Sequence, residues 1–127
     1  MFDSEIVLDL LSRIVEATRR IERRMEGIES PEDFMRDDDT LTRLDAIGMM
    51  LIAIGESLKM IDKHVPPGFF ADYPEVNWRA AKGMRDFLSH AYWDLEIETV
   101  FNACKESLPK LKDACERLAA EVGENGV

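Results

Sequence analysis

A short stretch in the second half of the chain, residues 85–92, gathers side chains suited to chemistry on a phosphate. Its sequence, Arg-Asp-Phe-Leu-Ser-His-Ala-Tyr, holds a permanent cation, a carboxylate, an imidazole and a phenol. The imidazole of His90 titrates close to neutral pH and can move protons. The guanidinium of Arg85 presents a planar fork of donors that fits phosphate oxygens. Together the two groups could cut or bind a phosphodiester without a metal ion.

The spacing within this stretch suits a helix with defined sides. At 3.6 residues per turn, Arg85, Ser89 and Tyr92 align along one side. Asp86 and His90 form an i,i+4 pair, so the carboxylate can orient the imidazole ring. Arg85 and His90 are themselves about 140° apart around an ideal helix. They can act together if the long Arg side chain bridges the gap, if the helix ends near His90, or if a second copy completes the site.

Periodic apolar residues predict that a helical bundle positions these side chains within a single domain, residues 1–127. No segment shows the alternation of a β-strand, so the predicted fold class is all-α, an up-and-down bundle of four main helices plus a short helix. The four expected helices cover residues 4–27, 40–63, 74–92 and 95–122, and a short turn follows Ser30-Pro31.

Local signals predict where these helices begin and break. Asp3 or Ser4 is expected to cap the first helix, and Asp38 or Asp39 the second. Pro109 is expected to kink the last helix or divide it in two. The first helix carries a predicted apolar stripe at Ile6, Leu10, Ile14, Ile21, Met25 and Ile28.

Two glycines, Gly48 and Gly55, lie seven residues apart inside the second expected helix. Each costs about 1 kcal/mol relative to alanine in a helix interior, so we expect another helix to approach them closely. Glu56 is interpreted as a structural acid, either at the helix surface or partly buried against a basic partner. His64, the second of two histidines, falls in a proline-containing loop and is assigned no role.

The net charge of −10 argues against a general nucleic-acid coat, and no DNA binding is expected. Basic residues nevertheless cluster at residues 19–24 and 79–85, while acids concentrate at residues 29–45. Such asymmetry allows a basic cleft on an acidic body, although solvated helix faces give the same pattern.

The composition also suggests a compartment. No apolar run approaches the roughly 18 residues of a membrane span, and the N-terminal residues lack a signal-peptide pattern. Cys104 and Cys115 would lie about 16 Å apart along one straight helix and could not bond to each other there. We interpret them as reduced core thiols of a cytoplasmic protein. No metal-ligand spacing or Gly-rich phosphate loop is present, so no metal or cofactor is expected.

This combination resembles the small HEPN-domain toxins, and more narrowly the subgroup paired with a minimal nucleotidyltransferase antitoxin. The resemblance covers essentially the whole chain. It rests mainly on the Arg-Asp-x3-His-x-Tyr motif at the end of the third expected helix. Secondary support comes from Ile54-Gly55-Glu56 in the second helix and from Leu108-Pro109.

The resemblance implies an all-α homodimer whose motif helices face a shared cleft and cut RNA without a metal. It implies that Arg85 and His90 are the catalytic pair, that Asp86 supports them, and that the antitoxin can modify Tyr92 with AMP. Ser89, aligned with Arg85, is a further supporting candidate. Some HEPN proteins bind nucleotides or assemble without cutting. A non-catalytic nucleotide- or partner-binding helical dimer is therefore the alternative, and a plain structural dimer a third.

Overall fold

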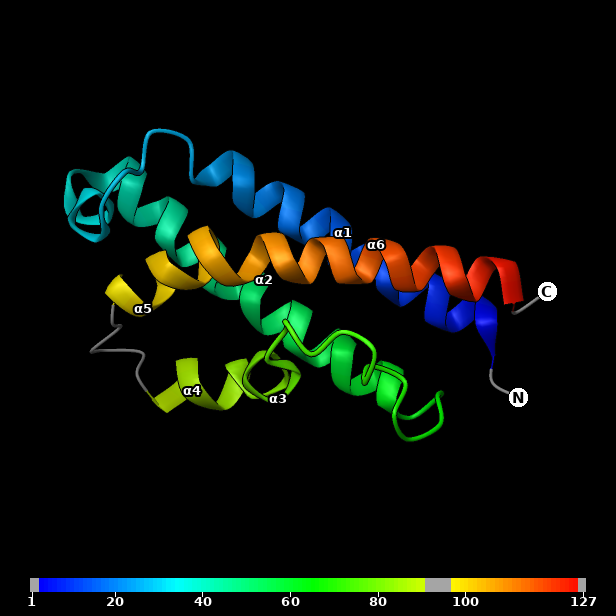
Figure 1. Cartoon of the computed structure of the whole chain (residues 1–127). Helices are drawn as coiled ribbons and strands as arrows, with labels where there is room; N and C mark the ends of the chain where they lie inside the picture. The colour runs from blue at the N-terminus through cyan, green and yellow to red at the C-terminus, as the bar shows by residue number, and fades with distance from the viewer. Residues whose placement is uncertain (1–2, 91–96, 126–127) are drawn as a thin grey trace.

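The structure is a computed structural model that describes residues 3–90 and 97–125, and every regular element within these ranges is helical. Three long helices dominate: α1 (Ser4–Arg24), α2 (Asp38–Asp62) and α6 (Leu108–Asn125). α1 packs against both α2 and α6, while the short helices α3 (Trp78–Lys82) and α4 (Met84–His90) lie against α2 (Figure 1). The predicted all-α fold class is confirmed, and the homodimer stays a prediction.

α1 begins at one of its two predicted caps. The carboxylate of Asp3 accepts a hydrogen bond from the Ile6 N–H at 3.3 Å, which satisfies one of the free donors of the first turn. The chain leaves the helix through Gly27, whose φ of +78° lies in the left-handed region that favours glycine. Both ends of this helix are therefore set by local residues.

The buried face of α1 starts one residue later than predicted. Ile6 is 39% exposed and Leu10 is only half-buried, whereas Val7 and Leu11 are fully buried. Both choices keep helical spacing, so the periodicity alone does not separate them. Packing against α2 and α6 decides the rotation of the helix, and the prediction is confirmed from Ile14 onward.

The cap of α2 is Asp37, so the prediction of Asp38 or Asp39 is wrong. The Asp37 carboxylate accepts from the Thr40 N–H at 2.9 Å, and the Asp37 N–H donates to the Thr40 hydroxyl at 3.1 Å. Three successive aspartates can all act as caps, and the buried Thr40 selects the one that lies three residues before it. The short turn expected before this helix is η1 (Pro31–Met35).

The prediction of one continuous third helix over residues 74–92 is wrong. Helix begins only at Trp78, because the Asn77 side chain accepts from the Ala80 N–H at 3.0 Å and starts a new helix there. α3 then ends at Gly83, and α4 starts at the next residue. Two short helices therefore replace the one long helix, and the second of them carries the motif.

The last expected helix changes its hydrogen-bond pattern next to Pro109, where a kink or a division was predicted. α5 (Ile97–Asn102) runs into one π-helical segment, η2 (Ala103–Ser107), and α6 follows. Proline has no N–H and its ring crowds the preceding turn, so the hydrogen-bond ladder changes just before it. There the Leu108 N–H bonds to the carbonyl five residues earlier.

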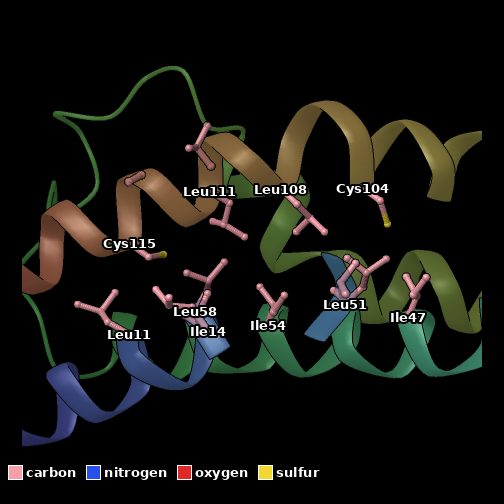
Figure 2. Packing of buried hydrophobic residues seen from close by; sticks show 14 of the residues in the cluster. Leu11, Ile14, Ile47, Leu51, Ile54, Leu58, Cys104, Leu108, Leu111 and Cys115 are labelled. Carbon is pink, nitrogen blue, oxygen red and sulfur yellow. The ribbon is translucent and has the colours of Figure 1, made fainter. Parts of the chain in front are cut away.

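The buried side chains of these elements form one core cluster. Figure 2 shows apolar side chains of η2 and α6 pointing onto those of α1 and α2. Cys104 and Cys115 are free and buried in this cluster, and burial raises the pKa of each thiol to about 12. Their interpretation as core thiols is confirmed. In the described parts of the chain, no helix is both long and apolar enough to span a membrane.

Candidate active site on α4

α4 carries the predicted motif and is anchored to the core on one side. Leu88 is buried and Met84 is half-buried, whereas Arg85, Asp86 and Phe87 are exposed. The helix therefore presents Arg85, Asp86 and Phe87 to the surface while Leu88 holds it on the core. The helical setting expected for Arg85 is confirmed.

Gly55 of α2 allows α3 and α4 to lie close. A Cβ atom at this position would stand 2.7 Å from the carbonyl oxygen of Ala81 and 3.6 Å from the Cβ atom of Met84. Any larger residue would therefore push the α3–α4 segment away from α2. Close approach is confirmed at Gly55. At Gly48 the prediction is wrong, because a Cβ atom added there would meet no other element of the described residues within 4 Å.

Glu56 connects α2 to the motif. Its Oε1 atom lies 3.8 Å from Nη1 of Arg85 and 3.7 Å from Nζ of Lys59. The Arg85 side chain is 61% exposed, so this ion pair is screened by solvent. A guanidinium has five N–H donors, and such a contact leaves them able to bind a phosphate. Glu56 is thus a surface acid that pairs with two cations, Arg85 and Lys59. The sequence analysis did not predict the contact with Lys59.

The remaining motif residues are described only in part. Ser89 and His90 are the last residues of α4 by backbone, and their side chains, like the whole of Tyr92, lie outside the described residues. Arg85 and His90 therefore share one helix. Positions five residues apart on a regular α-helix stand about 140° apart.

Three cations follow one another along α3 and α4, namely Arg79, Lys82 and Arg85, with no acid at residues 76–85. Lys82 pairs with Asp62 at 2.7 Å. Arg79 is exposed, and among the described residues no carboxylate lies within 4 Å of its guanidinium. Residues 76–85 are thus a basic segment on a chain of net charge −10.

A groove of about 470 Å³ adjoins the site, between the α3–α4 segment and the η2–α6 segment. Ile54 and Leu111 lie on its apolar floor, and Asn77 and Lys110 are among its polar lining residues. Met84, next to Arg85 in sequence, also lines it. Within the described residues, no three His, Cys, Asp or Glu side chains gather into a possible metal site.

Comparisons with known proteins point to one family. A family model described as "Ribonuclease HepT-like" matches residues 14–118. The chain is 36% identical over 110 residues to "Probable ribonuclease HepT" of Thermococcus cleftensis, covering 87% of this chain and 93% of that protein. It is 31% identical over 102 residues to a "Putative RNase" of Caldanaerobacter subterraneus subsp. tengcongensis, covering 80% of this chain and 84% of that protein. No solved structure matches.

Proposed function

The chain belongs to the HepT-like ribonuclease family, as its sequence resemblance indicated, and we propose that it is a metal-independent endoribonuclease of a toxin–antitoxin pair. The observation that carries the proposal is the placement of Arg85. Its guanidinium is exposed on α4, paired with Glu56 of α2, and on the same helix as His90. An exposed but tethered cation, on a helix that also carries a histidine, suits a reaction on an RNA phosphate.

In the proposed reaction, RNA supplies its own nucleophile, the 2′-OH. His90 takes the 2′-OH proton while the oxygen attacks the neighbouring phosphorus, which contributes roughly 10²–10⁴-fold. Arg85 donates hydrogen bonds to the phosphate oxygens as negative charge develops in the transition state. The bond from phosphorus to the 5′-oxygen breaks and that oxygen takes a proton. The products carry a 2′,3′-cyclic phosphate and a 5′-OH.

We place this reaction in the cleft of a homodimer. Positions 85 and 90 stand about 140° apart on a regular helix, and a second copy would bring another pair to the same phosphate. One His90 would then act as the base and the other as the acid. Phe87, 42% exposed on the same helix, is an apolar side chain that such an interface would cover.

The proposed partner is a minimal nucleotidyltransferase antitoxin that modifies Tyr92. The phenol oxygen would attack the α-phosphorus of ATP and release pyrophosphate, leaving AMP on the ring. The added bulk and negative charge, two residues after His90, would repel RNA and neutralise Arg85. The free thiols of Cys104 and Cys115 suit the reducing cytoplasm, where both partners would meet.

The alternative is a non-catalytic subunit that binds a nucleotide or a protein partner. The groove of about 470 Å³ beside α4 favours it, because apolar walls with a few polar groups are typical of ligand sites. Under this alternative the protein has no toxicity to lose. Substitution of His90 therefore separates the two functions.

The test is growth after induction of the wild type or of His90→Ala, together with incubation of each purified protein with total RNA in EDTA. We expect the wild type to arrest growth and cut RNA, and His90→Ala to do neither while keeping its fold and its dimer. His64→Ala, which alters the other histidine, is the matched control and should behave as the wild type does. A folded, dimeric wild type that leaves RNA intact would refute the ribonuclease. Cleavage that stops in EDTA would refute its metal independence.

A further inference from the structure

An open hollow lined by aromatic rings lies at the connection between α2 and α3. It has a volume of about 530 Å³ and is lined by Phe69, Phe70 and Trp78 together with Lys82. Figure 1 shows this connection folding back along the C-terminal half of α2 before α3 begins. The proposed reaction uses none of these rings.

The rings are held in place by contacts within the chain. Phe70 stacks on Trp78 with centroids 4.3 Å apart, and Phe69 meets Phe70 edge to face at 5.1 Å. The indole N–H of Trp78 donates to the Tyr73 carbonyl at 2.9 Å. Phe70 is buried, whereas Phe69 and Trp78 are only half-buried and keep part of their surface accessible. A platform already ordered in this way loses little side-chain freedom when a flat ligand stacks on it.

Cationic residues lie between this hollow and the motif along the sequence. Lys82 lines the hollow and stands three residues before Arg85, and Arg79 is exposed on the same short helix. Asp62 is the one acid among the lining residues, and its pairing with Lys82 at 2.7 Å offsets its charge. Arg79, without a carboxylate within 4 Å in the described parts of the chain, is left to attract an anion.

We propose that this hollow binds a base of the single-stranded RNA substrate, stacked on Phe69 and Trp78, while Arg79 holds the adjoining phosphate. Aromatic rings beside cations are the usual means of holding single-stranded nucleic acid without reading its sequence. The Cα atoms of Lys82 and Arg85 are at most about 11 Å apart, which a few nucleotides can span. The inference rests on the proposed function, since it requires RNA as the substrate.

The test compares two probes of equal length, a fluorescent oligouridylate and an abasic ribose–phosphate chain, on the His90→Ala protein to prevent cleavage. We expect the oligouridylate to bind at least about fivefold more tightly, because stacking needs a base. Phe69→Leu and Trp78→Leu should each bring the two affinities close together. Arg79→Ala should weaken both probes equally. Phe101→Leu is the matched control, since it alters a half-buried ring of α5 covered by the Lys105 ammonium at 5.7 Å.

Equal affinity for the two probes in the parent protein would overturn the inference, as would binding of neither. A preference for the oligouridylate that persists in Phe69→Leu and in Trp78→Leu would do so too. Circular dichroism verifies each fold, and Phe69→Leu suffices if Trp78→Leu unfolds. Cleavage of total RNA is measured separately with His90 intact, so failure of the hollow and failure of the ribonuclease are distinguishable.

Discussion

The two basic clusters of the chain, residues 19–24 on α1 and residues 79–85 on α3 and α4, differ in what adjoins their cations. In the α1 cluster, Arg20 and Arg23 both lie within 3.7 Å of one carboxylate of their own helix, that of Glu16. These pairs are exposed contacts of a solvated helix face. Among the described residues, the hollow beside this cluster is lined by charged side chains alone, acids among them: Arg19, Glu22, Arg23, Glu26 and Lys112.

The α3–α4 cluster is balanced to a similar degree, but the aromatic hollow adjoins it. Arg79 has no carboxylate within 4 Å among the residues described, and Arg85 shares the single carboxylate of Glu56 with Lys59. Its helices are also held closely against α2. The comparison teaches that the number of cations does not identify a functional patch, because both clusters are equally evident in the sequence. The side chains that adjoin the cations distinguish the two clusters.

The largest expected effect separates the two clusters directly. Arg85→Ala should lower kcat/KM for RNA by roughly 10²–10³, because it removes donors that stabilise the transition state. Arg20→Ala makes the same change of charge on α1 and should leave the rate near that of the wild type. The measurement is the initial rate of RNA cleavage, with circular dichroism for the fold. Equal losses in the two variants would show that the clusters act only through net charge.

The support of the α3–α4 cluster is tested at two glycines of one helix. Gly55→Ala places a Cβ atom against the Ala81 carbonyl and should lower the free energy of unfolding by about 1–3 kcal/mol. Gly48→Ala enters open space and should raise it by about 0.5–1 kcal/mol. Urea denaturation of both variants measures the difference. If Gly55→Ala were as stable as Gly48→Ala, the close packing of α3 on α2 would be wrong.

A smaller effect on RNA cleavage is expected from substitution of Glu56, the acid that pairs with Arg85. Glu56→Gln removes the charge that Arg85 and Lys59 share, and a surface ion pair contributes about 0–1 kcal/mol. Cleavage should therefore change by less than roughly fivefold, far less than in Arg85→Ala. Steady-state rates on one RNA measure both. A loss as large as that of Arg85→Ala would give Glu56 a part in the reaction itself.

The smallest effect concerns the connection that carries the aromatic hollow. The Tyr73 hydroxyl donates to Glu121 of α6, and this hydrogen bond raises the pKa of Tyr73 from 10.0 to about 12. Because the folded value is the higher one, the stabilisation is complete below about pH 10 and is lost as pH rises towards 12. Urea midpoints of the wild type and Tyr73→Phe should therefore converge over that range. Parallel curves would contradict the hydrogen bond.

Local patterns predicted what depends on neighbouring residues. The cap at Asp3 and the close approach at Gly55 are confirmed, and the helix is irregular next to Pro109. Errors arose where several local choices were equivalent. Any of three aspartates suited the cap of α2, and the buried Thr40 selected one. Likewise, two apolar rows of α1 had helical spacing, and packing chose between them.

The sequence by itself determined which groups are available: a guanidinium and an imidazole five residues apart, within a segment that forms helix. The tertiary structure decided what surrounds them. The contact between Arg85 and Glu56 exists because Gly55 lets the α3–α4 segment lie against α2. The break at Gly83 sets where α4 starts. Ion pairs between helices depend on the rotation and separation of both helices, and those follow from the packing of the whole core, which no local pattern contains.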